Sequence, residues 1–352
     1  MDRREFIKRM AGLGVASAGL LAGGRLFAAM LDAGGSPATR AMRGSSTLRA
    51  SPAGEPGGFG PAAESWDGGR VPVSEALPQL VAVKGPTGTS AAADGPVKLF
   101  TAGIAALGGM GRFVAKGETV VIKPNIGWDV APDRAANTNP LLVAAIIEAC
   151  LAAGAKRVYV VDHSCDEWRA CYKSSGIEAA ARQAGATVAP AGSESYYHKV
   201  EMRGATTLSS VKVHELLLEA DSIINVPVLK SHGGAGMTCA LKNLMGTVWD
   251  RQAFHFQGLD RCIAEVALAV RPKLTVVDAS RVMLTGGPRG NGSTRYAELG
   301  MQILSPDIVA VDAASAKSFG SGQRTFPYIG MAAALGLGSA DLTSLDIRRI
   351  QL

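Results

Sequence analysis

The side chains best suited to chemistry follow an apolar run that begins at Ile223 and ends in Lys230 and His232. Lys242 and Asn243 come only a few residues later. Two amines, an imidazole and an amide over so short a stretch can bind an anion, and an amine or the imidazole can exchange a proton with a substrate. The segment therefore predicts a functional site, with Lys230, His232 and Lys242 as candidate catalytic residues and Asn243 as a candidate binding residue.

The turn after His232 is rich in glycine, with Gly233, Gly234 and Gly236. Successive backbone N–H groups in such a turn can surround an anion, so we expect Gly233 and Gly234 to contact the substrate. The spacing G-x-x-x-x-G-K-[ST] is missing, and no G-x-G-x-x-G follows a predicted strand. The sequence therefore contains no nucleotide-binding motif.

The elements that position these residues are predicted by short runs of β-branched residues, which alternate with segments of helical periodicity. Near-continuous apolar runs are typical of strands buried on both faces, and we expect strands at residues 81–83, 119–123, 157–162, 222–229, 274–278 and 308–312. Asn139 and Pro140 predict the start of a helix that ends before Gly154, and a second helix is expected at 177–183. The alternation predicts an α/β fold with a mostly parallel, doubly wound sheet and helices on both faces.

Ionisable or amide side chains stand at the ends of almost all these strands. They are Lys123 and Asn125, Asp162 and His163, Lys230 and His232, Asp278, and Asp312. Ligands of open parallel sheets bind beyond the carboxyl ends of the strands, so we expect these residues to share one cleft in which Lys123, Lys230 and Lys242 hold an anion. Asp312 is better explained as a helix cap, and Asp278 fits a cap or a site residue equally well.

Metal binding is an alternative use of the same cleft. Asp162, His163, His232 and Asp278 are ligands that a divalent metal ion accepts, and His255 could join them. Their spacing matches no established metal motif, and ammonium groups nearby would repel a cation unless they were neutral or paired. A divalent metal therefore remains an alternative cofactor beside the anionic ligand.

The five cysteines are too few and too scattered for an iron–sulfur cluster. Cys165 and Cys171 could form a disulfide in an oxidising compartment. Cys239 is the only candidate for a reactive thiol, since it lies near Lys242, whereas Cys150 and Cys262 fall on apolar helical faces and belong to the core.

The first residues resemble an export signal. Arg3-Arg4-Glu5-Phe6-Ile7-Lys8 is similar to the twin-arginine motif and precedes a short apolar stretch, which predicts a signal peptide at residues 1–30, the twin-arginine translocase as partner and a periplasmic location. The alternative is a basic terminus of a cytoplasmic protein. Residues 31–75 are rich in Gly, Pro and Ser and read as a linker, or as an arm docked through Trp66, before a single α/β domain at 76–352.

Most of the net positive charge of the chain lies in its first 50 residues. The whole chain carries a net charge of +6, but the first 50 residues hold eight Lys/Arg and only three Asp/Glu. The remainder is nearly neutral and has few aromatic residues, which argues against a nucleic-acid partner.

Residues from about 81 to 320 resemble the family called domain of unknown function 362. The resemblance rests on AKGETVVIKPN, TNPLLVAAIIEACLAAGAKRVYVVD, the lysine-histidine segment, ALKNLMGTV, VVDASRVMLTGGPRG and IVAVDAASAKSFG. It implies an α/β fold and marks as matching positions Lys123, Asn125, Lys230, His232, Lys242, Asn243 and the turn Gly286-Gly287-Pro288. Some members carry an added four-cysteine module that this chain lacks, so no iron–sulfur cluster is expected.

These observations favour a periplasmic enzyme that acts on a small anionic metabolite or cofactor precursor. Lys123, Lys230 and Lys242 would orient the anion, His232 would act as acid/base, and Asn125, Gly286 and Gly287 would contact the substrate. The alternative is a non-catalytic protein that binds or delivers a metal or cofactor to exported redox enzymes. A third hypothesis is an accessory subunit held through the arm that contains Trp66.

Overall fold

The apolar runs of the sequence form the centre of a large sheet. The computed structural model describes residues 77–86, 94–320 and 325–352, all within one compact unit. The predicted signal peptide and linker lie outside these residues. The strands of this sheet, in chain order, are β1 (Leu80–Lys84), β2 (Thr119–Pro124), β3 (Arg157–Val160), β4 (Thr187–Val188), β7 (Ser222–Val226), β8 (Val228–His232), β9 (Gly236–Thr238), β10 (Leu274–Met283), β11 (Tyr296–Ser305) and β12 (Ile347–Gln351).

Most neighbouring strands of the sheet are parallel. Their order is β12-β1-β11-β10-β7-β2-β3-β4, and β8 and β9 extend from β10. Only β11, which pairs with β1 and β10, and β9, which pairs with β8, run antiparallel to their neighbours among the described strands. The predicted mostly parallel sheet is therefore confirmed. A separate hairpin consists of β5 (Tyr197–Glu201) and β6 (Ser210–His214).

Side chains along each central strand alternate between two apolar clusters. In β2, Val121 joins one cluster while Val120 and Ile122 join the other, and all three are fully buried. Such alternation is expected of a strand covered on both faces. The near-continuous apolar runs of the sequence follow from this double burial.

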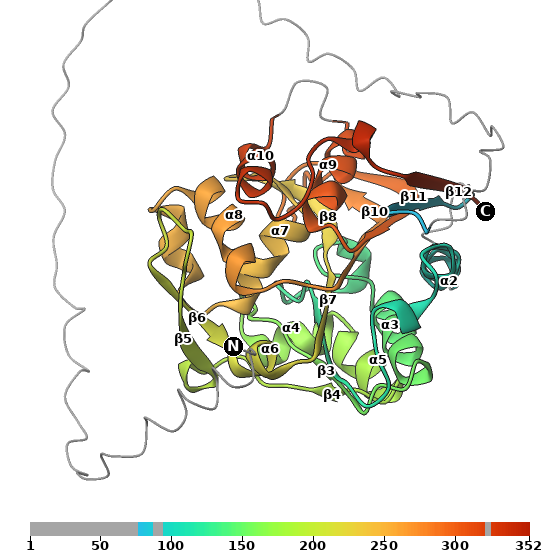
Figure 1. The fold of residues 1–352 in the computed structure, drawn as a ribbon, viewed down its shortest axis with the longest axis horizontal. Coiled ribbons are helices and arrows are strands. Elements are labelled where there is room, and N and C mark those ends of the chain that lie inside the picture. The colour runs from blue at the N-terminus through green and yellow to red at the C-terminus, as the bar shows by residue number, and fades with distance from the viewer. Residues whose placement is uncertain (1–76, 87–93, 321–324) are drawn as a thin grey trace, which may run out of the picture. The chain divides into compact units, whose positions relative to one another are not determined.

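Helices cover both faces of the sheet, as the sequence predicts. Figure 1 shows α2, α3 and α5 on one side and α7, α8, α9 and α10 on the other. The helices are α2 (Gly95–Ala106), α3 (Pro140–Ala152), α4 (Trp168–Ser174), α5 (Ile177–Gln183), α6 (Glu215–Glu219), α7 (Ala240–Asn243), α8 (Leu259–Ala269), α9 (Ile308–Ser318) and α10 (Pro327–Ala334).

The start of α3 shows how local chemistry fixes an element. The Asn139 side chain accepts a hydrogen bond from the Leu141 N–H at 2.9 Å, and Pro140 occupies the first helical position, where no N–H is needed. Gly154, with φ of +96°, follows the end of the helix. The predicted helix at 140–152 is confirmed, as is the helix at 177–183.

The strand expected at 308–312 is wrong, because these residues form the first turns of α9. Asp307 accepts hydrogen bonds from the N–H groups of Val309 and Ala310, both at 2.9 Å. This cap starts a helix despite the β-branched residues that follow it. The strand of this region is β11, which ends at Ser305 immediately before Pro306 and Asp307.

Asp312 is a helix cap, but of a different helix. It lies in the middle of α9, fully buried, and its two oxygens accept the N–H groups of Ala240 at 2.6 Å and Leu241 at 3.1 Å. Burial raises the pKa of Asp312 to about 6. Asp312 therefore anchors the first turn of α7, the element that carries Lys242 and Asn243.

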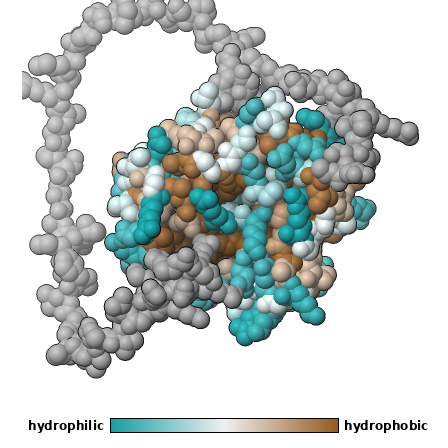
Figure 2. All heavy atoms as spheres, viewed as in Figure 1, coloured by the Kyte–Doolittle hydropathy of each residue, from teal (hydrophilic) through white to brown (hydrophobic). Residues whose placement is uncertain are grey.

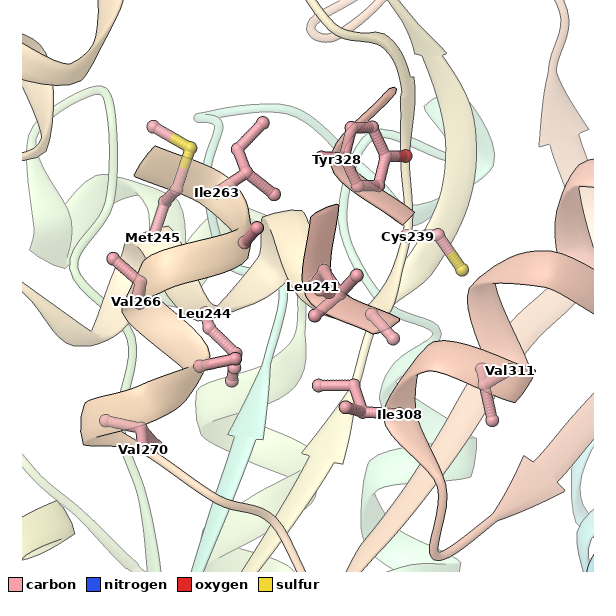
Figure 3. Packing of buried hydrophobic residues seen from close by; sticks show 14 of the residues in the cluster. Cys239, Leu241, Leu244, Met245, Ile263, Val266, Val270, Ile308, Val311 and Tyr328 are labelled. Atoms are coloured by element: carbon pink, nitrogen blue, oxygen red, sulfur yellow. The ribbon is translucent and has the colours of Figure 1, made fainter. Parts of the chain in front are cut away.

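The apolar side of α7, together with Leu244 that follows it, packs between two other helices. Figure 3 shows Leu241 and Leu244 close to Val266 of α8 and Ile308 of α9, and all four are buried. This packing holds α7 against the sheet. Lys242 is directed instead toward the carboxyl ends of the strands, where it lines a cavity.

The chain changes direction in the sheet beside β2. From β2 it proceeds through α3 to β3 and then to β4, whereas the later strand β7 pairs with the opposite edge of β2. Lys123 of β2 is paired in register with Asn225 of β7. The carboxyl ends of these two strands mark a topological switch point, where open α/β sheets bind their ligands.

The outer surface of the described body is mixed in character. On the face drawn in Figure 2, hydrophobic residues lie between strips of hydrophilic ones. None of the helices in the described ranges is long and apolar enough to cross a membrane.

Candidate functional site

A cavity of about 980 Å³ opens at the carboxyl ends of the strands, next to the switch point. Residues that follow β2 and β3 form part of its wall, and β8 and the segment from α7 to His255 form most of the remainder. Eight of the residues singled out from the sequence line it: Lys123, Asn125, Asp162, His163, Lys230, His232, Lys242 and Asn243. The strand ends thus come together as expected for an open α/β sheet.

Lys123 and Asp162 form a buried ion pair at the base of this cavity. Lys123 Nζ lies 2.6 Å from Asp162 Oδ1, and also donates to the Pro124 carbonyl at 2.6 Å and to Asn243 Oδ1 at 3.0 Å. An ammonium has three N–H donors, and all three have protein partners here. Burial lowers the pKa of Lys123, and the nearby Asp162 opposes that shift. Lys123 therefore has a structural role, and its ammonium has no N–H left to donate to a ligand.

Gly246 is required for the approach of this ion pair. A Cβ atom at that position would lie 1.9 Å from Asp162 Oδ1 and 2.8 Å from Lys123 Nζ. The second oxygen of Asp162 accepts the Ile126 N–H at 2.6 Å, so the carboxylate is held from two sides and cannot easily move away. Only glycine fits between the ion pair and the backbone of residue 246.

A chain of asparagines connects Lys230 with the centre of the sheet. Asn125 accepts from Lys230 Nζ at 3.1 Å and donates to Asn243 Oδ1 at 3.0 Å. Asn243 in turn donates to Asn225 Oδ1 at 2.8 Å, and Asn225 donates to the Ala240 carbonyl at 3.0 Å. Each amide in this series accepts from one neighbour and donates to the next. The series fixes the position of the Lys230 amine and accounts for the roles of Asn125 and Asn243.

Lys230 is buried, yet it lacks a carboxylate partner. Its Nζ donates to Asn125 Oδ1 and to the Ala136 carbonyl, which leaves one N–H without a protein acceptor in the described part of the chain. Burial, with a smaller contribution from the positive charge of Lys242, lowers the pKa of Lys230 to about 7. At neutral pH the amine is therefore divided between its charged and neutral forms.

Lys242 and Arg251 add positive charge to the same cavity. Among the described residues, the only side-chain hydrogen-bond partner of Lys242 Nζ is Met245 Sδ, at 3.6 Å. Burial lowers the pKa of Lys242 to about 8. Arg251 donates to the carbonyls of His163 and Ser164, so its guanidinium is held by neutral oxygens. None of the carboxylates in the described ranges lies within ion-pair distance of Lys230, Lys242 or Arg251.

His232 has a defined tautomer in this arrangement. Its Nδ1 accepts hydrogen bonds from the N–H groups of Gly234 and Ala235, both at 3.1 Å, so the proton of the neutral ring is on Nε2. Burial lowers the pKa of His232 to about 3, and the charges of Lys242 and Lys230 contribute to the shift. His232 is therefore a neutral hydrogen-bond donor at physiological pH.

The predicted substrate-contacting glycines lie elsewhere than expected. The Gly234 N–H is occupied by His232 and is not available to an anion. Gly233, Gly286 and Gly287 line a second cavity, of about 600 Å³, which shares His232 with the 980 Å³ cavity. Gly287 lies so close to β8 that a Cβ there would be 1.9 Å from the Ser231 carbonyl oxygen. Close packing against β8 therefore accounts for the glycine at this position.

The four metal ligands considered from the sequence do not assemble. Asp278 lines a third cavity, of about 270 Å³, and accepts the N–H groups of Asn139 at 2.9 Å and Ser280 at 3.2 Å. Asp162 is paired with Lys123, and the Nδ1 of His163 is 3.0 Å from the Val248 carbonyl. Across residues 77–86, 94–320 and 325–352, no three His, Cys, Asp or Glu residues are grouped so that they could hold a metal ion.

The cysteines also differ from expectation. All five are free thiols, so the pairing of Cys165 with Cys171 is not formed. Cys239 is buried, and burial together with Asp312 raises the pKa of its thiol well above the usual value, which makes it unreactive. Cys165 is the exposed cysteine; it lines the 980 Å³ cavity, with its sulfur 3.6 Å from an Arg251 nitrogen.

Comparison with known proteins identifies the family of this chain. The family model described as "Domain of unknown function (DUF362)" matches residues 120–317, which cover more than half of the chain and hold most of the cavity wall. The chain belongs to the DUF362 family. A curated relative is the thylakoid-associated protein sll1697 of Synechocystis, which is 28% identical over 253 residues, or 67% of this chain and 74% of the relative.

Two solved structures resemble this DUF362 protein only distantly. The lactate racemase apoprotein of Thermoanaerobacterium thermosaccharolyticum gives a TM-score of 0.39 at 11% identity, with 65% of this chain and 56% of that chain covered. A Thermotoga maritima protein gives 0.39 at 13% identity, with 58% and 55% covered. The chain thus spans little more than half the length of these structures, and the resemblance carries no functional argument.

Sequence reasoning missed Asn225 and Arg251 of this DUF362 site. Asn225 is fully buried inside β7, and an amide within an apolar strand signals a polar network, because a buried amide needs partners. Arg251 begins a short 3-10 helix (Arg251–His255) after α7, and it has no sequence signal comparable to a strand end. Only the fold brings it next to Lys242.

Proposed function

We propose that this protein is an enzyme that binds a small anionic metabolite or cofactor precursor in the 980 Å³ cavity. The observation that carries the proposal is the set of three cations, Lys230, Lys242 and Arg251, which line one cavity without a carboxylate partner among the described residues. Lys230 is buried, and Lys242 and Arg251 are half-buried. Like charges at such positions repel each other and lose part of their hydration, so a carboxylate or phosphate placed among them would relieve both costs.

The pKa values of the two amines support an anionic ligand. Lys230 has a pKa of about 7 and Lys242 of about 8, both lowered by burial. An anion within hydrogen-bond distance favours the charged form of each amine and raises its pKa. Binding at neutral pH should therefore be accompanied by uptake of protons from the solvent.

Lys230 replaces His232 as the proposed proton acceptor. The Nδ1 of His232 is occupied by two backbone N–H groups and the pKa of the ring is about 3, so it can donate through Nε2 but cannot readily accept a proton. A Lys230 pKa of about 7 is suited to general acid–base chemistry near neutrality. We assign Lys230, Lys242 and Arg251 to anion binding and His232 to hydrogen-bond donation, and Lys230 also exchanges a proton with the ligand.

Metal delivery gains no support from the described residues. A metal bound through His232 Nε2 would need the ring proton on Nδ1, where the N–H groups of Gly234 and Ala235 point. The other suggested ligands lie apart or are already paired. The cavity is therefore better matched to an anion than to a cation.

Export to the periplasm is part of the proposal and is supported by the sequence alone. The twin-arginine-like motif at residues 3–8 lies outside the described residues, and the translocase is its proposed partner. An exported redox enzyme remains a proposed secondary partner. Replacement of both Arg3 and Arg4 by Lys should retain the protein in the cytoplasm, as measured by cell fractionation; unchanged export would contradict the twin-arginine route.

The anion site can be tested with the variant Lys242→Met, which keeps the length of the side chain but removes its charge. Isothermal titration calorimetry with pyrophosphate and with oxalate should show at least about tenfold weaker binding, because hydrogen bonds to charged groups contribute about 1.5–3 kcal/mol. Lys98→Met is the matched control, since Lys98 is an exposed lysine of α2. Equal affinity of the two variants, or absence of binding to the unmodified protein, would refute the proposal.

A further inference from the structure

The described tryptophans all lie at the same cavity. The chain has four, and Trp128, Trp168 and Trp249 each line the 980 Å³ cavity, whereas Trp66 lies outside the described residues. Aromatic residues make up only 5% of the chain, so this grouping is not a consequence of an aromatic-rich composition. All three side chains are partly exposed rather than buried in the core.

Two of these rings are held by neighbouring side chains. Trp249 stacks on His163 with 4.8 Å between ring centroids and 5° between ring planes. Trp168 meets Tyr172 edge to face at 5.6 Å and lies against Gly192, where a Cβ would come within 2.2 Å of the indole. Rings fixed in this way lose little further freedom when a ligand binds.

Trp128 is held through its backbone instead. Its N–H donates to Asn137 Oδ1 at 3.1 Å, and its carbonyl accepts from Asn137 Nδ2 at 2.9 Å. Its ring makes no aromatic or cation–π contact with any residue of the described ranges, unlike Trp168 and Trp249. A fixed backbone and a cavity-lining ring without a stacking partner are suited to contact with a planar ligand.

The cavity is also larger than an inorganic anion requires. Pockets for organic ligands measure about 300–1,000 Å³, whereas a water-sized group occupies roughly 30 Å³. The cavity, at about 980 Å³, is at the upper end of that range. An anion held by Lys230, Lys242 and Arg251 would fill only a small part, so the remaining ligand atoms must lie along the tryptophan-lined wall.

From this arrangement we infer that the ligand carries a planar aromatic or heteroaromatic ring in addition to its carboxylate or phosphate. The inference rests on the proposed function and specifies the class of ligand. The anionic group contacts Lys230, Lys242 and Arg251, and the ring lies against the tryptophans, with Trp128 as the free stacking surface.

Two matched pairs of compounds test this inference on the full-length protein. Phenyl phosphate and cyclohexyl phosphate share the anionic group but differ in the planar ring, as do benzoate and cyclohexanecarboxylate. In at least one pair, the aromatic member should bind about fivefold more tightly by calorimetry, in the range expected for an aromatic contact. It should also quench tryptophan fluorescence, and inorganic phosphate should bind more weakly than either organic phosphate.

The variant Trp128→Leu tests whether the preference for aromatic ligands depends on the ring of Trp128. It should abolish the aromatic preference and leave the affinity for inorganic phosphate unchanged. Phe256→Leu is the control, because Phe256 is 92% exposed and is not part of the cavity wall. The comparison within each pair is made on the unmodified protein, so the inference remains testable even if Trp128→Leu fails to fold.

The outcomes separate the two proposals. If phosphate or pyrophosphate binds in a Lys242-dependent manner but the aromatic and alicyclic compounds bind equally, the ring inference is wrong and the anion site stands. If none of these anions binds, both proposals are wrong. An aromatic preference that persists in Trp128→Leu and also in the triple variant Trp128→Leu/Trp168→Leu/Trp249→Leu would overturn the assignment to the tryptophan wall.

Discussion

Lys123 and Asp162 form an ion pair of 2.6 Å in which the side chains are only 1% and 3% exposed. One comes from the end of β2 and the other from the residues after β3, so the pair joins two strands at the base of the cavity. In the sequence Lys123 looks equivalent to Lys230 and Lys242. The structure separates them, because Lys123 alone of the three has a carboxylate partner within the described residues.

Loss of the Lys123 ammonium should destabilise the fold strongly. The variant Lys123→Met leaves the Asp162 carboxylate buried without its partner, which costs about 3–5 kcal/mol in the free energy of unfolding. Urea denaturation measures this value. Lys98→Met removes an exposed lysine, 66% accessible, and should change stability by no more than about 1 kcal/mol. Similar losses in the two variants would show that Lys123 is not a structural lysine.

Replacement of Gly246 by alanine should disturb the same ion pair. The added Cβ would lie 1.9 Å from Asp162 Oδ1, so the carboxylate must move and the stability should fall by several kcal/mol. Gly330→Ala in α10 is the matched control: nothing lies within 4 Å of its Cβ, and alanine in a helix should stabilise by about 0.5–1 kcal/mol. Thermal unfolding should therefore shift in opposite directions for the two variants.

The sequence predicts those parts of the fold that depend on local signals. Asn139 and Pro140 start α3 as expected, and the strand ends that carry Lys123, Asp162 and Lys230 meet because carboxyl ends of parallel strands lie on one edge. The same reasoning placed Asp278 at a strand end, which is wrong. The strand β10 continues through Asp278 to Met283, so this residue lies inside a strand. Strand length was the missing information.

The other errors arise from tertiary contacts that a local pattern does not contain. The run Ile308-Val309-Ala310-Val311 has a high strand propensity, yet the Asp307 cap and packing against the sheet make it a helix. Cys239 lies near Lys242 in sequence, but it is buried beside Asp312. Sequence proximity therefore overstated its reactivity, while the distant Arg251 and Cys165 meet in the cavity.

The two unpaired lysines should make both stability and anion binding depend on pH. Their pKa values in the folded protein, about 7 and about 8, are below the value of about 10.4 for an unfolded chain. Between these values the unfolded state binds more protons, so this contribution to stability increases as the pH rises from about 7 to 10. In Lys242→Met the increase should be smaller, as measured by urea denaturation across this range.

Anion binding should have the opposite pH dependence. The charged amines attract the ligand, so affinity should rise as the pH falls through about 8 and then about 7, and become constant below pH 6. Calorimetry of oxalate binding in buffers of different ionisation enthalpy should show proton uptake at pH 8, because oxalate stays fully ionised across this range. Affinity that is independent of pH between 6 and 9 would contradict a role for these amines.

His232 should stay neutral well into the acid range. Its pKa of about 3 and the two N–H donors at Nδ1 require an uncharged ring with the proton on Nε2 at pH 5, where an ordinary histidine is charged. Nitrogen-15 chemical shifts distinguish the two ring nitrogens and the charged form. His198 is a suitable internal comparison, because its ring is exposed and lies 3.4 Å from Glu215. A charged His232 ring at pH 5 would exclude its assignment as a neutral donor.

Cys165 offers a direct measure of occupancy of the cavity. Cys165 is exposed and the other four cysteines are buried, so an alkylating reagent should modify Cys165 first. Its sulfur is 3.6 Å from an Arg251 nitrogen, whose positive charge should attract the anionic reagent iodoacetate. The ratio of the iodoacetate rate to the rate with neutral iodoacetamide should therefore be higher for Cys165 than for free glutathione. Arg251→Leu should reduce this preference, and pyrophosphate should slow the modification by iodoacetate when it occupies the cationic site. Peptide mass spectrometry measures each rate at Cys165; modification that is insensitive both to Arg251→Leu and to pyrophosphate would place the bound anion elsewhere.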